Sequence, residues 1–124
     1  MAVVVIDALQ PRLIADFWCE VLGWQVVETD DDVITIGPAD RSWPMIDVVA
    51  VPESKTIKNR LHLDLRADGV STAAELDRLT GLGARHADVG QPPDASWVVL
   101  ADPEGNEFCL LSRTVQEVRR GPGG

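Results

Sequence analysis

His62 and Asp64 have the clearest potential for chemistry in this sequence. They lie two residues apart in Leu61–Leu65, where apolar and polar residues alternate. The alternation predicts a half-buried strand, and both side chains would point to one face of it. On the wall of a cavity, an imidazole beside a carboxylate can act as an acid/base pair or orient a ligand. The alternatives are a structural histidine and an aspartate that pairs with Arg60 or Arg66.

Glu107 and Cys109 form a second pair with the same spacing, in the segment Glu107–Leu111. This segment also has the composition of a strand, so the two side chains would share a face. Glu107 joins His62 as a candidate catalytic residue, and Cys109 joins Asp64 as a candidate ligand-binding residue. The alternatives are that Glu107 accepts hydrogen bonds from its own hairpin and that Cys109 is a small buried hydrophobe.

Aromatic and basic residues near the expected loops are candidate contacts for a small molecule. Trp43 and Trp97 lie at strand entries, where an indole ring can stack on a flat ligand. Packing under a loop is the alternative. Lys55, Lys58 and Arg60 are clustered in a chain with only 11 basic residues, and they could attract an anion. A solvated surface is the alternative there.

Composition excludes several classes of partner. The formal net charge of −9 repels phosphate backbones and anionic lipid, so we expect neither nucleic acid nor membranes as partners. The apolar runs are too short to span a bilayer, and no signal peptide is recognisable. Two cysteines do not make a disulfide scaffold, so a reduced, cytoplasmic protein is expected.

Hydrophobic periodicity and turn residues predict an α+β fold with the order βαβββ, repeated once. The first set is expected at Ala2–Ile6, the helix Pro11–Leu22, Trp24–Glu28, Val33–Gly37 and Met45–Val51. The second set is expected at Leu61–Leu65, a helix that begins at Thr72 and ends at Gly83, Arg85–Val89, Trp97–Ala101 and Glu107–Leu111. Thr72 and Glu75 have the spacing of a capping box at the start of the second helix.

Each helix ends in a Leu-Gly step, and these steps, Leu22-Gly23 and Leu82-Gly83, are about 60 residues apart, which indicates a duplicated unit. We therefore expect one domain over residues 1–115, with modules at about 1–52 and 60–113. The strands Leu61–Leu65 and Val3–Ile6 should be equivalent. Residues 114–124 are polar and rich in glycine and are expected to form a flexible tail.

Three motifs resemble the vicinal oxygen chelate superfamily, which includes glyoxalases, bleomycin resistance proteins and dioxygenases. They are Phe17-Trp18-Cys19-Glu20-Val21-Leu22-Gly23-Trp24, Lys58-Asn59-Arg60-Leu61-His62-Leu63-Asp64-Leu65 and Asp102-Pro103-Glu104-Gly105-Asn106-Glu107-Phe108. The first resembles the family's first-helix signature, and the last its final hairpin. The middle one is similar to a glyoxalase-like subgroup. The resemblance covers nearly the whole chain.

The resemblance implies that the strands of both modules form a curled mixed sheet around a cup-shaped cavity. It also implies a homodimer and, in many relatives, a divalent metal in the cup. It does not fix the reaction, because relatives include isomerases, ring-cleaving dioxygenases, thiol transferases and metal-free binding proteins.

The positions implied for the metal ligands are occupied by Val3, Asp47, His62 and Cys109. Valine cannot bind a metal, and a cysteine replaces the usual carboxylate. We therefore expect no metal cofactor of the oxygen-ligated kind. If a divalent metal binds, Asp47, His62 and Cys109 would hold it as a three-ligand zinc site. Asp47 could instead pair with Arg41 or Arg60.

These expectations favour a small-molecule-binding protein that lacks the usual metal site. The alternative is an enzyme of the same superfamily, a lyase or isomerase that uses His62. The sequence does not decide between them, and it does not name the ligand or substrate. A regulatory module without a small ligand is a third reading.

Overall fold

A computed structural model describes residues 1–87 and 97–120 of the chain. It divides into two compact units, 1–56 and 57–124, which are treated separately below. The boundary falls between the modules that the sequence predicts at about 1–52 and 60–113. Within the described ranges, no helix is long and apolar enough to cross a membrane.

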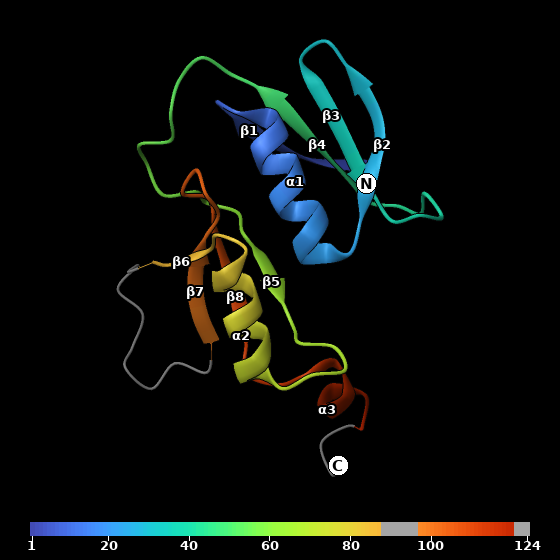
Figure 1. Cartoon of the computed structure of the whole chain (residues 1–124), viewed down its shortest axis with the longest axis vertical. Coiled ribbons are helices and arrows are strands. Elements are labelled where there is room, and N and C mark those ends of the chain that lie inside the picture. The colour runs from blue at the N-terminus through green and yellow to red at the C-terminus, as the bar shows by residue number, and fades with distance from the viewer. Residues whose placement is uncertain (88–96, 121–124) are drawn as a thin grey trace. The chain divides into compact units, whose positions relative to one another are not determined.

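The first unit is a four-stranded mixed sheet with one helix (Figure 1). Its elements are β1 Val3–Ala8, α1 Pro11–Leu22, β2 Gln25–Asp30, β3 Val33–Gly37 and β4 Met45–Ala50. The strand order is β1-β4-β3-β2, with β1 parallel to β4 and the other pairs antiparallel. The parallel pair is connected through α1 and the β2–β3 hairpin, as two parallel strands require a crossover.

Helix α1 begins and ends where the sequence predicts. Pro11 occupies its first turn, where a missing N–H costs nothing. Gly23 follows its last residue with φ +67°, and its N–H donates to the carbonyl of Cys19. The buried stripe of the helix includes Phe17 and Trp18. Their rings pack edge to face, with 5.2 Å between the ring centroids. Burial of this stripe holds α1 against its sheet.

The second unit repeats the order and adds a short helix at its end. Its elements are β5 Leu63–Leu65, α2 Thr72–Gly81, β6 Arg85–His86, β7 Trp97–Ala101, β8 Glu107–Leu111 and α3 Val115–Arg119. The strand order is β5-β8-β7-β6, with β5 parallel to β8. Val89, the expected end of the sixth strand, lies outside the described residues.

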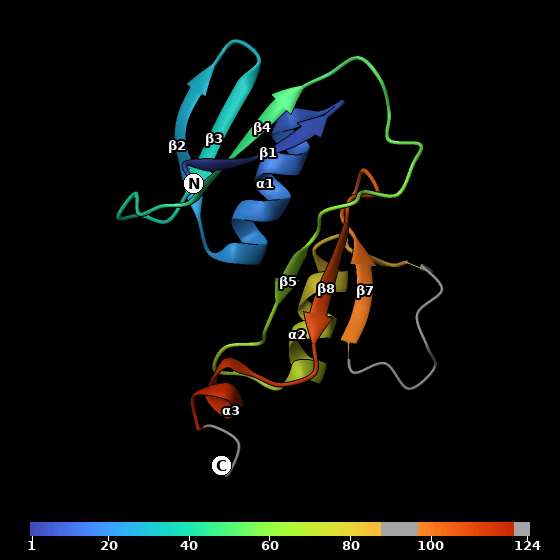
Figure 2. The same cartoon turned by 180° about the vertical axis from the view of Figure 1, so that it is seen from behind.

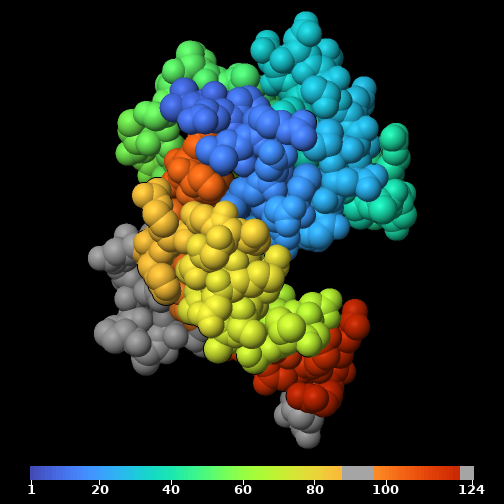
Figure 3. All heavy atoms as spheres, in the orientation of Figure 1, coloured from blue at the N-terminus to red at the C-terminus, as the bar shows by residue number. Residues whose placement is uncertain are grey.

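Helix α2 covers one face of the second sheet, and the candidate residues belong to the other. Leu100, Phe108 and Leu110 are fully buried on the covered face. The space-filling view shows the atoms of α2 over this side of the unit (Figure 3). Figure 2 shows the same sheet from behind. Because side chains alternate along a strand, Asp64 and Cys109 point to the face opposite α2.

The two units share their register as well as their order. In the first, Val5 of β1 pairs with Asp47 of β4, and in the second, Asp64 of β5 pairs with Cys109 of β8. Both are parallel pairs at the same place in the module. The prediction of two βαβββ modules is thereby confirmed. The curl of the sheets and the cup-shaped cavity stay predictions.

The start of α2 differs from the prediction. Ser71, not Thr72, is the N-cap, and its hydroxyl accepts a hydrogen bond from the N–H of Ala74. Glu75 instead pairs with Arg78 one turn later, at 2.7 Å. The hydroxyl of Thr72 donates to the carbonyl of Ser112. Either hydroxyl residue can cap a helix, so the pattern located the helix but not its cap.

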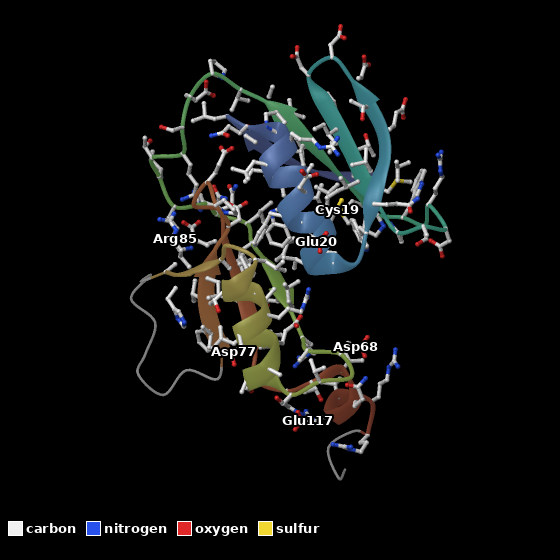
Figure 4. The ribbon with its side chains drawn as sticks, viewed as in Figure 1. Cys19, Glu20, Asp68, Asp77, Arg85 and Glu117 are labelled. Atoms are coloured by element: carbon white, nitrogen blue, oxygen red, sulfur yellow. The ribbon has the colours of Figure 1, made fainter. Side chains whose placement is uncertain are left out.

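Helix α3 was not expected, because its segment was assigned to a flexible tail. It begins with a capping box, in which Thr114 and Glu117 each accept a hydrogen bond from the other's backbone N–H. The side chain of Gln116 donates to Asp68 at 2.6 Å and accepts from the N–H of Gly69 at 2.9 Å. Figure 4 shows Glu117 on α3 and Asp68 on the loop before α2. These bonds attach the segment to its own unit.

Candidate functional site

His62 and Asp64 lie side by side, as the alternation predicts. The Nε2 atom of His62 is 3.1 Å from Oδ1 of Asp64, and their side chains are 42% and 48% exposed. Strand β5 begins only at Leu63, so His62 directly precedes the strand that was expected to contain it. Arg66, the alternative partner of Asp64, donates a hydrogen bond from its Nη1 to the carbonyl of Arg113 at 3.0 Å.

Cys109 joins this pair from the neighbouring strand. It stands opposite Asp64 in the parallel register and is 6% exposed. Burial raises the pKa of the Cys109 thiol, and the charge of Asp64 and a hydrogen bond to Asp64 raise it further. The thiol therefore carries its proton at neutral pH. The charge of Lys58 acts in the opposite direction.

The three side chains form one cluster, which we call the His62 cluster: His62, Asp64 and Cys109. Their ligand atoms, one from each residue, all lie within 4.8 Å of one another. The carboxylate of Asp64 links the other two, since it contacts the imidazole and accepts from the thiol. An imidazole, a carboxylate and a thiol can together hold a polar ligand, move a proton or bind a cation.

Glu107 is held by a segment distant in sequence. Its Oε1 accepts a hydrogen bond from the backbone N–H of Asn59, at 3.0 Å. The side chain of Asn59 also donates to Oδ1 of Asn106, at 3.0 Å. Both bonds attach residues 57–62 to the β7–β8 hairpin. Sequence reasoning missed Asn59, because its partners are 47 and 48 residues away and no local pattern signals them.

A buried aspartate holds the hairpin itself in shape. Asp102 is fully buried, and its carboxylate accepts hydrogen bonds from the N–H of Glu104 and from the N–H and Nδ2 of Asn106. Asx turns of this type fix the path of a loop. Asn106 is thereby oriented so that its Oδ1 faces Asn59. The position of the His62 cluster thus depends on the hairpin at one end and on β5 at the other.

The remaining candidates are divided between the two units. Trp43 and Asp47 belong to the first unit; Trp43 is 69% exposed. The Oδ1 atom of Asp47 accepts a hydrogen bond from the hydroxyl of Thr35 at 2.7 Å. Trp97 begins β7, and its register with Leu111 puts it on the same face as Cys109.

The family's usual metal, held by oxygen and nitrogen ligands, does not fit these residues. On the first unit, Val3 pairs with Met45, and neither side chain offers a ligand for a hard cation. On the second unit, Cys109 replaces a carboxylate. The donor set that the structure brings together is one nitrogen, one oxygen and one sulfur. This set suits a softer ion such as Zn²⁺.

Solved structures with the same fold come from several bacteria. A glyoxalase/bleomycin resistance protein/dioxygenase family enzyme from Burkholderia phytofirmans is 22% identical, with 88% of this chain and 94% of that one covered and a TM-score of 0.60. A glyoxalase-related enzyme from Fulvimarina pelagi is 16% identical, with 90% and 86% covered and a TM-score of 0.63. At these identities the likeness shows the fold alone.

A further neighbour was solved with bound ligands. It is a variant of the fosfomycin resistance protein FosX from Listeria monocytogenes, in complex with Mn(II) and a dihydroxypropylphosphonic acid. It is 10% identical, with 96% of each chain covered and a TM-score of 0.70. A search of curated proteins found no match. The family profile described as glyoxalase-like domain matches residues 3–111. The chain therefore belongs to the glyoxalase-like domain family.

Proposed function

We propose that the protein binds a small oxygenated molecule on the face of the second sheet opposite α2, without the hard metal ion that many relatives use. The observation that carries this proposal is the His62–Asp64 pair, at 3.1 Å and about half exposed. The imidazole has one nitrogen at the carboxylate, which leaves the other ring nitrogen available for a hydroxyl or carbonyl group. Trp97, on the same face, would offer a flat apolar contact.

The electrostatics of this site favour a neutral ligand. Asp64 and Glu107 contribute negative charge, whereas Lys58 lies close enough to influence the Cys109 thiol. A polar group on the ligand would therefore meet both signs of charge within one small region. In such sites a few polar groups orient the ligand and apolar surface supplies most of the affinity.

The same pair supports an alternative, a lyase or isomerase in which His62 acts as general base. Asp64 would orient the imidazole and stabilise its protonated form, as carboxylates do beside catalytic histidines. Glu107 would be the second catalytic group. Turnover of a bound compound, abolished by replacing His62, would favour this alternative over simple binding.

The experiment is a ligand titration with paired histidine variants. Native mass spectrometry of the purified chain identifies any carried compound, and small aromatic alcohols and vicinal diols serve as probes in NMR titrations with EDTA present. His62→Ala should weaken binding about 5- to 150-fold, the effect of losing one polar contact of about 1–3 kcal/mol. His86→Ala is the matched control, because His86 is an exposed histidine of the same unit.

Two outcomes would contradict the proposal. Probe binding that His62→Ala and His86→Ala weaken equally would show that the site is elsewhere. Chemical-shift changes confined to residues of the first unit would also show that the probe binds elsewhere.

A further inference from the structure

We propose that Asp64 fixes His62 as a hydrogen-bond acceptor, so that the ligand is a neutral hydroxyl compound rather than a carbonyl compound. Alcohols, phenols and vicinal diols belong to this class. The inference rests on the proposed function and narrows it, since that function leaves open whether a hydroxyl or a carbonyl group meets the imidazole. Asp64 is thereby a positioning residue, which acts on the ligand through His62.

The contact between Asp64 and His62 determines where the imidazole carries its proton. A neutral imidazole has one N–H and one acceptor nitrogen, whereas an ionised carboxylate only accepts hydrogen bonds. Nε2 of His62 lies 3.1 Å from Oδ1 of Asp64, so the N–H belongs to Nε2. A bond at one ring nitrogen selects the tautomer of a histidine in this way. Nδ1 is then without a proton and accepts a hydrogen bond from the ligand.

Cys109 holds the Asp64 carboxylate in this role. The two residues stand opposite each other in the parallel register of β5 and β8. Burial and the charge of Asp64 raise the pKa of the Cys109 thiol, so the sulfur keeps its proton and donates to the carboxylate. Two donors, the thiol and the imidazole N–H, therefore converge on one carboxylate. A carboxylate that accepts from both has no proton to give to Nε2.

The surroundings of the pair also favour a ligand that donates. In residues 1–87 and 97–120, the ring of His62 makes one polar contact, the one with Asp64. Glu107 lies two residues before Cys109 on the same strand face, and its Oε1 is an acceptor for the N–H of Asn59. The ammonium of Lys58 donates to the carbonyl of Asn59. A ligand hydroxyl can donate to Nδ1, whereas a ketone oxygen would meet it lone pair to lone pair.

The tautomer is measured directly, without a ligand. Long-range ¹H–¹⁵N NMR spectra distinguish protonated from unprotonated ring nitrogens in the full, reduced, ¹⁵N-labelled chain. The buffer contains EDTA and is held at about pH 8.5, where imidazole side chains in general are neutral. We expect His62 to be protonated at Nε2 and not at Nδ1. In Asp64→Asn the amide N–H can donate to Nε2, so part of the population should move to the Nδ1–H tautomer. His86 is exposed, and its tautomer mixture should be the same in both proteins.

The ligand class is tested with two probes that share a carbon skeleton. 1-Phenylethanol has a hydroxyl group where acetophenone has a carbonyl group, and only the alcohol donates. In NMR titrations in the same buffer, the alcohol should bind at least about 5-fold more tightly than the ketone, the effect of one hydrogen bond. Asp64→Asn should reduce this preference to about twofold or less, because the tautomer is no longer fixed. His86→Ala should leave the preference unchanged.

Two cysteine variants separate positioning from packing. Cys109→Ser keeps a donor for Asp64 and should retain both the Nε2–H tautomer and the preference for the alcohol. Cys109→Ala removes the donor and should weaken both. Circular dichroism spectra check the fold of each variant.

Two results would overturn the inference: a wild-type His62 that carries its proton on Nδ1, or acetophenone binding as tightly as 1-phenylethanol. If equal binding is lost in His62→Ala, the proposed function still stands and only the ligand class is wrong. Probe binding that His62→Ala does not change contradicts both.

Discussion

Asp64 stands opposite Cys109 in adjacent parallel strands, and its carboxylate also contacts His62 at 3.1 Å. One short side chain thus connects residues that are 47 positions apart in sequence. A register shift of one residue between β5 and β8 would turn Asp64 to the α2 side and separate the cluster. The chemistry of this face therefore depends on what fixes the register, which is the hairpin and the segment before β5.

The two modules offer a pair of glycine substitutions with opposite expected signs. Gly23→Ala should destabilise the chain by about 1–2 kcal/mol, because an L-residue is strained at φ +67°. Gly81→Ala, at the end of α2, should stabilise it by about 0.4–1 kcal/mol, since alanine has fewer unfolded conformations. An added Cβ meets nothing within 4 Å at either position, so only backbone conformation differs. Urea denaturation measures the free energy of unfolding of both variants. Changes of the same sign would contradict the prediction.

Lowering the pH should destabilise helix α3. The Glu117 carboxylate accepts a hydrogen bond from the backbone N–H of Thr114, which lowers its pKa from the usual 4.5. A lowered folded-state pKa means that the stabilisation is complete above pH 4.5 and is lost as the pH falls through the folded value. NMR amide exchange of residues 114–119 between about pH 6 and about pH 3 should show this loss.

Glu117→Gln is the control for the titration. The amide oxygen can accept the same hydrogen bond but does not ionise, so the acid-dependent change should disappear. An unchanged pH profile in this variant would assign the effect to another group. Asp40 also has a lowered pKa, through hydrogen bonds from Ser42, but it lies in the first unit.

How much of this structure was accessible from sequence depended on whether the signals were local. Pro11, the apolar stripe and Gly23 lie within one helix, and the predicted bounds of α1 are those observed. The His62–Asp64 pair followed from strand alternation alone, although β5 is shorter than predicted. These features need no information about distant parts of the chain.

The sequence analysis did not predict the role of Asn59 or the helix α3. The first depends on tertiary contacts, and the second has a local signal that was overlooked. Asn59 binds Asn106 and Glu107 across 47 and 48 residues, and no period or spacing indicates that. The capping box of α3, by contrast, is readable as Thr114 followed three residues later by Glu117. A helix of five residues is marginal in isolation. Bonds from α3 to Asp68 and Gly69 hold the helix in place. Composition does not signal these bonds, so it predicted a flexible tail.

We expect the protein to be a homodimer, as the resemblance implied. Val3 and Val5 are 38% and 55% exposed on β1, the edge strand of the first sheet in the described structure. Apolar side chains on an exposed edge favour association with another chain. Light scattering at micromolar concentration should give twice the mass of the chain, and Val5→Lys should shift it toward the monomer. A wild-type monomer under these conditions would contradict the expectation.

Asn59 should be energetically coupled to Asn106. The bond between their side chains attaches the segment before β5 to the hairpin, so its loss should cost about 0.5–1.5 kcal/mol. In a double-mutant cycle, Asn59→Ala after Asn106→Ala should cost less than Asn59→Ala alone, by a coupling energy of about 0.5 kcal/mol or more. Urea denaturation of the four proteins gives this energy, and additive effects would show that the bond is not stabilising. Because the bond precedes His62 by three residues, Asn59→Ala should also broaden the NMR signals of the His62 ring, whereas Asp77→Ala on the exposed side of α2 should not.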